Sequence, residues 1–280
     1  MKRILASFLF GTICITLFAQ APLPTEADID AFYNSKTLVV LEGGLFSSYN
    51  VYIKEEIGKY WKITPFEIIS EQEFDEKKTD NSYSFLVVTQ TRFERDRDGV
   101  NYTFLNLLLG ADVSAISEMP EFGSIPLSYT GVENENYSYK LGIMIKFLQN
   151  RVEEFKKNPN VPAMKPLKYY NKNSSQIKTN TLYLLEGDLT PKVQQPKDIM
   201  KYYPYDFKIV TTDELSAIVS NDESAYFLHC VGPETSQREG WSFKMIFGIQ
   251  DGNLYYYGIH TISAKKPGGF LDSDFKRIAK

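Results

Sequence analysis

The amino-acid sequence predicts a mixed α/β fold made of two tandem repeats, each a mixed five-stranded sheet covered by helices. The main observation is that residues 37–45 (TLVVLEGGL) return as residues 181–189 (TLYLLEGDL). In both halves, apolar runs of strand length alternate with segments of helical periodicity, and short links then join the last strands. Strand–helix–strand connections favour parallel strands, whereas short links favour antiparallel ones.

The echo continues in order along both halves. The further matches are residues 59–61 with 201–203, 66–70 with 207–211, 84–87 with 225–228, 102–104 with 241–243, 122–123 with 257–258, and 127–128 with 262–263. Chance similarity of β-rich segments is the alternative, but six further blocks in one order favour tandem duplication. The matches concentrate on apolar strand positions and glycines, which burial and turn geometry constrain most.

The elements expected in the first half follow from caps, breakers and periodicity. They are a helix from Thr25 to Tyr33, a strand at 37–41, a helix capped by Ser47 or Ser48, a strand at 66–69, a polar helix at 70–78, a strand at 83–89, a charged turn at 94–99, a strand at 102–109, an irregular excursion at 111–121, a strand at 122–128, and a helix at 137–157. The second half repeats this order. Its last two strands flank Asp251-Gly252-Asn253, a hairpin signal, and a short helix at 271–278 closes it.

Four segments are expected along the chain. Residues 1–20 resemble a secretory signal peptide, with a basic start and an apolar stretch too short to suggest a bilayer span. Residues 21–158 form the first repeat domain and residues 180–280 the second, and each is expected to close its own apolar interior. The proline-rich and polar stretch 159–179 marks a linker. We therefore expect a periplasmic or extracellular protein whose mature chain has no membrane span.

The cysteine count and the net charge limit the disulfides and the classes of partner that this chain can have. Cleavage of the signal removes Cys14, so Cys230 alone remains and no intramolecular disulfide can form. It also removes Lys2 and Arg3, which leaves 29 of the 31 basic residues against 35 acidic ones and a net charge near −6. This balance argues against nucleic acid as a partner and leaves an unknown protein or glycan.

The strand order is similar to that of the small N-terminal domain of TolB-type periplasmic proteins. The chain also resembles exported bacterial two-repeat α/β proteins that carry a domain of unknown function. Both resemblances concern topology, and neither implies a role for any residue of this chain.

No catalytic residue, cofactor or metal site is expected. The mature chain has two histidines, His229 and His260, and His229 precedes Cys230 on a strand, so their side chains point to opposite faces. A structural histidine is the favoured interpretation. The alternating acids of the turn at 94–99 imitate the start of a calcium loop, but the twelfth position is Leu105 rather than a bidentate glutamate.

The best ligand-binding candidates are the two loops after the first strand of each half. They comprise Glu42, Gly43 and Gly44, and Glu186, Gly187 and Asp188. The carboxyl edge of a parallel sheet is where α/β proteins usually bind ligands. The alternative is a plain sharp turn with a locally paired glutamate. If the loops bind a ligand, they are expected to face each other across a pseudo-twofold interface.

Clustered tyrosines are the second candidate. Consecutive tyrosines on a strand should place some rings outward, where they suit protein contacts or sugar stacking. The expected aromatic contact face comprises Tyr202, Tyr203, Tyr255, Tyr256 and Tyr257. The alternative is that tyrosine fits a half-buried sheet well.

The scarcity of catalytic residue types favours a non-enzymatic secreted or periplasmic binding or scaffold protein. Two alternatives stay open. One is a carboxylate-dependent hydrolase acting on cell-wall or polysaccharide substrates, and the other is a structural subunit of an envelope assembly.

Overall fold

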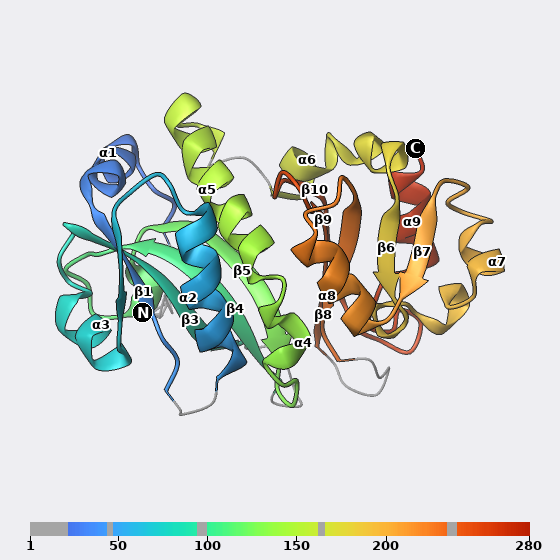
Figure 1. The fold of residues 1–280 in the computed structure, drawn as a ribbon, viewed down its shortest axis with the longest axis horizontal. Coiled ribbons are helices and arrows are strands. Elements are labelled where there is room, and N and C mark those ends of the chain that lie inside the picture. Colours follow the sequence, from blue (N-terminus) through green and yellow to red (C-terminus); the bar gives the residue numbers. More distant parts are fainter. Residues whose placement is uncertain (1–21, 44–46, 94–99, 162–165, 234–239) are drawn as a thin grey trace, which may run out of the picture.

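The computed structural model describes residues 22–43, 47–93, 100–161, 166–233 and 240–280. The expected signal peptide, Gly44 and the charged turn at 94–99 lie outside these ranges. We call residues 22–161 the first unit and residues 166–280 the second unit. Figure 1 shows the two units side by side, each with its own sheet.

The first unit contains, in chain order, α1 (Glu26–Asn34), β1 (Lys36–Val40), α2 (Ser48–Tyr60), β2 (Phe66–Ile69), α3 (Glu71–Lys77), β3 (Tyr83–Arg92), β4 (Asn101–Leu109), the 3-10 helix η1 (Ile116–Glu118), β5 (Glu121–Tyr129), α4 (Glu135–Ser138) and α5 (Leu141–Lys157). The second unit contains α6 (Pro166–Asn171), the 3-10 helices η3 (Ser174–Thr179), η4 (Glu186–Asp188) and η5 (Pro191–Val193), α7 (Pro196–Ile199), α8 (Thr212–Ser220) and α9 (Asp272–Ile278), with strands β6 (Leu182–Leu185), β7 (Phe207–Val210), β8 (Tyr226–Val231), β9 (Trp241–Gly248) and β10 (Leu254–Thr261).

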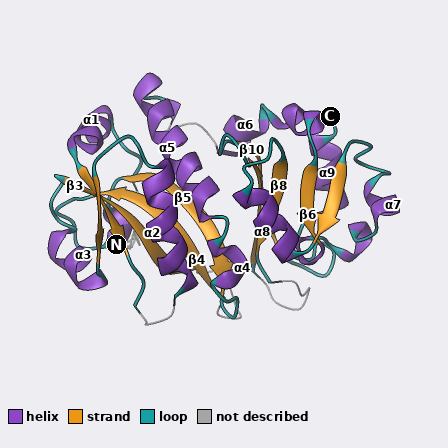
Figure 2. Ribbon diagram, in the orientation of Figure 1, coloured by secondary structure: helices purple, strands orange, loops and turns teal. Residues whose placement is uncertain are grey.

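The strand connectivity of the two units is the same. The strands of the first sheet run in the order β2-β1-β3-β4-β5, and those of the second run β7-β6-β8-β9-β10. In each sheet the first three strands are parallel, and the last two pair antiparallel. The prediction of two mixed α/β units, each with a five-stranded sheet and covering helices, is confirmed (Figure 2).

Local capping explains where several helices begin. Thr25 and Asp28 form a reciprocal capping box at α1, as the sequence predicts, and Ser70 with Glu73 forms one at α3. Thr211 and Glu214 do the same at α8. Each box satisfies main-chain N–H groups that would otherwise lack partners at a helix start.

The hydrogen-bond ladders correct the residue alignment of the repeats. Phe66 pairs with Thr37, and its counterpart Phe207 pairs with Leu182, so Thr37 corresponds to Leu182 rather than to Thr181. The same one-residue shift applies between β3 and β8, where Val87 corresponds to His229. A shift of one residue turns a strand side chain to the other face of its sheet, so the ladder and not residue similarity assigns the faces.

Each unit has a buried cluster of its own, but the cluster around α5 runs through both units, so the expectation that each would close a separate interior is only partly met. Helices α2 and α5 cover one face of the first sheet, and α3 covers the other. Helix α5 also contacts the second sheet, where the ring of Phe147 lies 5.6 Å from that of Phe247, edge to face. The buried cluster around α5 therefore runs through both units, while α9 and η3 close the opposite face of the second sheet.

The segment between the repeats is structured. Helices α6 and η3 occupy most of the expected linker, and Ile177 is fully buried. The side chain of Asn171 binds the main chain of Tyr257 on β10, accepting from its N–H at 2.7 Å and donating to its carbonyl at 2.9 Å. The segment therefore covers the β10 edge of the second sheet.

Candidate functional site

The loop after β1 is the better formed of the two expected ligand loops. The half-buried Glu42 carboxylate accepts hydrogen bonds from Ser47 Oγ at 3.1 Å and Asn134 Nδ2 at 2.8 Å. The side chain of Asn50 binds the main chain of Glu42 twice, accepting from its N–H and donating to its carbonyl, each at 2.9 Å. Ser47 is also the N-cap of α2, so the helix start and the glutamate are held by one set of contacts.

Glu42 and Gly43 border a cleft of about 1100 Å³ at the carboxyl ends of β1 and β2. Its lining residues are Leu41, Glu42, Gly43, Ser47, Ser48, Asn50, Val51, Lys54, Ile68, Ile69, Ser70, Glu71, Gln72, Glu73 and Glu135. The starts of α2 and α3 form its two sides, which is the usual place for a ligand in an α/β sheet. Aliphatic side chains form part of the surface, and Val51 is 66% exposed there.

Four carboxylates line this cleft, which we call the acidic cleft, against one lysine. Each carboxylate is oriented by a hydrogen bond: Glu71 accepts from Gly43 N–H at 3.0 Å, Glu135 from Ser48 Oγ at 2.7 Å, and Glu73 from Ser70 N–H at 2.8 Å. Burial raises the pKa of Glu42, and the nearby Glu71 charge adds to that rise, while the bonds from Ser47 and Asn134 oppose it. The cleft therefore carries negative potential and suits a cationic group.

The second expected loop has a different structure. Glu186, Gly187 and Asp188 form the single-turn helix η4, and none of them lines the acidic cleft. The main-chain carbonyl of Asp188 accepts from Phe270 N–H at 2.7 Å. The Asp188 charge acts on Tyr139 and Lys140 of the first unit, whereas Glu42 binds Asn134. The two loops thus meet opposite ends of the segment 134–140 and do not face each other across a common cleft.

The expected tyrosine contact face is not formed, because both faces of the second sheet are covered near β10. Tyr203, Tyr255 and Tyr256 are buried, and only Tyr202 and Tyr257 are half-buried. The hydroxyl of Tyr203 donates to the carbonyl of the buried Ile177 at 3.1 Å, and that of Tyr255 donates to Asp251 of the hairpin turn at 2.5 Å. These three rings are buried in the core and do not form an exposed contact face.

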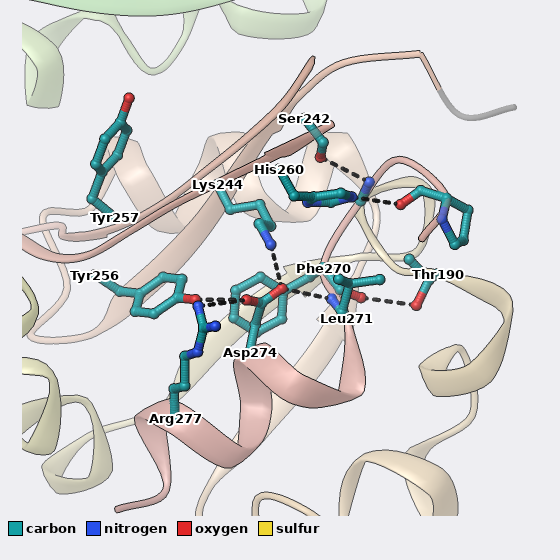
Figure 3. Close-up of polar contacts among 12 residues, drawn as sticks. Thr190, Ser242, Lys244, Tyr256, Tyr257, His260, Phe270, Leu271, Asp274 and Arg277 are labelled. Carbon is teal, nitrogen blue, oxygen red and sulfur yellow. Dashed lines mark hydrogen bonds and ion pairs between the residues drawn. The ribbon is translucent and has the colours of Figure 1, made fainter. Parts of the chain in front are cut away.

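The hydroxyl of Tyr256 belongs to a buried polar network that fastens α9 to the second sheet (Figure 3). It donates to the Asp274 carboxylate at 2.6 Å, and Lys244 Nζ pairs with the same carboxylate at 2.5 Å. The main-chain N–H of Leu271 completes the set at 2.9 Å. Nearby, His260 Nε2–H donates to the carbonyl of Pro267 at 3.0 Å. The contacts among Tyr256, Lys244, Leu271 and Asp274 satisfy one another inside the fold, so this network is structural.

His229 sits at the junction of the units. Its Nε2–H donates to the carbonyl of Pro126 on β5 at 2.9 Å, which leaves Nδ1 facing the buried Lys140 Nζ at 3.5 Å. Burial and the Lys140 charge together lower the pKa of His229 to about 3, so the imidazole is neutral. Burial likewise lowers the pKa of Lys140. Cys230 packs toward the other face of β8, so the two residues are not arranged to act together.

Sequence reasoning found Glu42 and Gly43 but missed Asn134, Glu71 and Lys140. Asn134 holds the Glu42 carboxylate, Glu71 lines the acidic cleft, and Lys140 lies at the junction of the units. In sequence, Asn134 is 92 residues from Glu42, and Lys140 is 89 residues from His229. None of the three belongs to a motif, so no local signal marks it.

The part of the chain that the structure describes shows neither a metal centre nor a membrane-spanning helix. No group of three or more His, Cys, Asp or Glu side chains is placed to hold a metal ion there. No helix in those ranges is both long and apolar enough to cross a bilayer. In comparisons with known proteins, no family model, no curated protein and no solved structure matches this chain.

Proposed function

We propose that this protein is a non-enzymatic binding protein, exported to the periplasm or the cell exterior, whose acidic cleft takes a basic and partly apolar segment of a partner polypeptide. The observation that carries the proposal is the cleft itself, in which oriented carboxylates surround exposed aliphatic side chains. Lysine and arginine side chains match this surface, because each carries a cationic end on an apolar stem.

The edge of the first sheet supports an extended partner. Strand β2 is an edge strand, and the carbonyls of Pro65 and Ile69 accept from the main-chain N–H groups of Thr37 and Leu41. In a parallel ladder, alternate residues turn their amide groups to opposite sides, so those of Phe66 and Ile68 point to the open edge. A segment lying along β2 would reach the carboxylates at its end, because Ile68 also lines the cleft.

The test is binding of two matched fluorescent heptapeptides, one alternating lysine with valine or leucine and the other with glutamate in place of lysine. Fluorescence anisotropy should detect the basic peptide only, with affinity falling as salt rises. Val51→Lys and Glu71→Gln should each weaken binding about five- to tenfold, because one rim contact is worth about 1 kcal/mol. Both side chains are exposed, so neither change should impair folding.

Glu76→Gln is the matched control, since this exposed glutamate lies on α3 but outside the cleft lining. It should change the affinity less than twofold. Equal binding of both peptides, or equal loss in Glu76→Gln and Glu71→Gln, would show that the cleft is not the binding site and would remove the proposal.

A carboxylate-dependent hydrolase is the second candidate, and one observation favours it. The raised pKa of Glu42 beside the Glu71 charge is the pattern of a general acid next to an ionised carboxylate. Turnover of peptidoglycan or polysaccharide by the purified protein, abolished in Glu42→Gln, would support this function over simple binding. Without turnover by the unaltered protein, the binding function stands.

A further inference from the structure

A second hollow lies where α5 and the α6–η3 segment that follows it meet the turn between β9 and β10, which is distant in sequence. Its volume is about 300 Å³. Its lining includes Asn150, Arg151, Tyr169, Tyr170, Asn173 and Gln176. We call it the junction pocket. It shares no lining residue with the acidic cleft.

The walls of the junction pocket are fixed by hydrogen bonds between the units and within the first unit. Asn150 Nδ2 on α5 donates to the carbonyl of Asp251 at 2.8 Å and to Asn253 Oδ1 at 3.1 Å. Arg151 Nε donates to the carbonyl of Phe122 at 2.7 Å, and its guanidinium also binds the hydroxyl of Tyr170. These bonds hold the tyrosine and the hairpin in place before any ligand arrives, which lowers the entropic cost of binding.

Other polar groups in the pocket remain available to a ligand. Among the described residues, the side-chain amides of Asn173 and Gln176 make no hydrogen bond, and both residues are exposed. Each amide offers donors and an acceptor. Beside them, the ammonium group of Lys172 lies 4.2 Å from the centre of the Tyr169 ring. The Tyr170 ring packs edge to face against the Tyr169 ring, with 5.2 Å between the ring centres. The pocket thus combines aromatic surface with unused donors and acceptors.

We infer that the junction pocket binds a small saccharide of one or two rings. A sugar hydroxyl both donates and accepts, which matches a free amide, and the apolar C–H face of a sugar ring suits a tyrosine ring. A purely apolar ligand would strand the amides away from water. A small anion is disfavoured because Arg151 is already bonded and Glu154 lines the same pocket. The volume lies at the lower end of the roughly 300–1000 Å³ found for ligand sites.

The test uses the full chain and six named probes: glucose, galactose, N-acetylglucosamine, and the β1,4-linked disaccharides cellobiose, lactose and chitobiose. Isothermal titration and saturation-transfer NMR should give saturable binding of at least one probe. Asn173→Ala and Gln176→Ala should each weaken that binding about five- to tenfold, the loss of roughly one hydrogen bond. Both residues are exposed, so loss of binding through unfolding is not expected, and circular dichroism checks this.

Asn136→Ala is the matched control, because this exposed amide lines neither the junction pocket nor the acidic cleft. It should leave saccharide affinity within twofold. Absence of saturable binding for all six sugars up to tens of millimolar, or binding that survives the paired Asn173→Ala and Gln176→Ala changes, would overturn the inference. The acidic-cleft peptide assay reports on different residues, so the two proposals fail independently.

Discussion

The His229 imidazole connects the two units, because its neutral form donates a hydrogen bond to the carbonyl of Pro126 in the buried junction between them. The charged or titratable groups around it are Lys140 from the first unit and Asp188 and Cys230 from the second. Lys140 is buried close to Nδ1, so a proton on His229 would place two cations together in a poorly solvated site. The junction therefore depends on the neutral form of this histidine.

The stability of the fold should consequently fall in mild acid. The folded pKa of His229 is about 3, below the ordinary 6.5, so between these values the unfolded chain binds more protons than the folded one. The contribution of neutral His229 to the free energy of unfolding is complete above pH 6.5 and is lost as the pH falls toward 3. At about 1.4 kcal/mol per pH unit, the free energy of unfolding in urea should drop by about 2 kcal/mol from about pH 7 to about pH 5 through this residue.

The readout is the pH difference rather than the absolute stability, so a destabilised variant still answers the question. His229→Gln should lose most of this difference. His260→Gln should lose less of it: burial and the Lys244 charge also lower the pKa of His260, but this imidazole is only half-buried and lies away from the junction. An unchanged difference in His229→Gln would show that the imidazole does not govern the acid response.

At the scale of elements, the β9–β10 turn packs directly on α5. Gly252 has a φ of +67°, and a Cβ at this position would overlap the Cβ of Lys146 on the helix. Lys146 Nζ binds Asp222 at 2.7 Å and the carbonyls of Ile249 and Gln250. The turn thus needs glycine at position 252 for two reasons, the left-handed backbone and the close contact with the helix.

Gly252→Ala should therefore destabilise the protein by about 3 kcal/mol or more, as measured by urea unfolding, because overlap with the helix adds to the backbone strain. Gly131 is the matched control. Its φ of +90° is also left-handed, but a Cβ added there would have no heavy atom of a neighbouring described segment within 4 Å. Gly131→Ala should cost only the backbone strain, about 1–2 kcal/mol. Equal losses in the two variants would mean that the helix contact contributes nothing.

The elements show what the sequence could predict. Hydrophobic runs, caps and the Asp251-Gly252-Asn253 turn placed the strands and helices in the right order, because these signals act over a few residues. The alignment of β1 with β6 was wrong by one residue, since Thr37 and Thr181 look alike but occupy different ladder positions. Residue similarity cannot detect a register shift that only the neighbouring strand defines.

The candidate site likewise contains some features that the sequence could predict and others that it could not. Glu42 and Gly43 were predicted because strand ends in parallel sheets are local features with a known location. The tyrosine face was wrong at Tyr255 and Tyr256, because strand periodicity does not reveal whether both faces of a sheet are covered. Both rings lie in the cluster that α9 and η3 close, and these elements are distant packing partners.

At the scale of the whole molecule, the second sheet depends on the first unit for one of its two faces. The side chains of Phe227, Phe243, Met245 and Phe247 lie in the core that surrounds α5. Burying each contributes about 1.5–3 kcal/mol, so the four together contribute roughly 6–12 kcal/mol. This is comparable with the entire stability of a typical domain, about 5–15 kcal/mol. Duplicated connectivity has therefore not produced two independent interiors.

A chain reduced to residues 166–280 should consequently fail to fold, even though it retains α6, η3, α9 and the other face of its sheet. We expect a circular dichroism signal without a cooperative urea transition and poorly dispersed amide NMR resonances, because the exposed apolar face leaves too little burial to offset chain entropy. The full chain should unfold in a single transition that both units share. A dispersed spectrum and a cooperative transition for residues 166–280 would instead mean that the second unit is stable alone, and that the contacts of Phe147 and Pro126 with it join two finished domains.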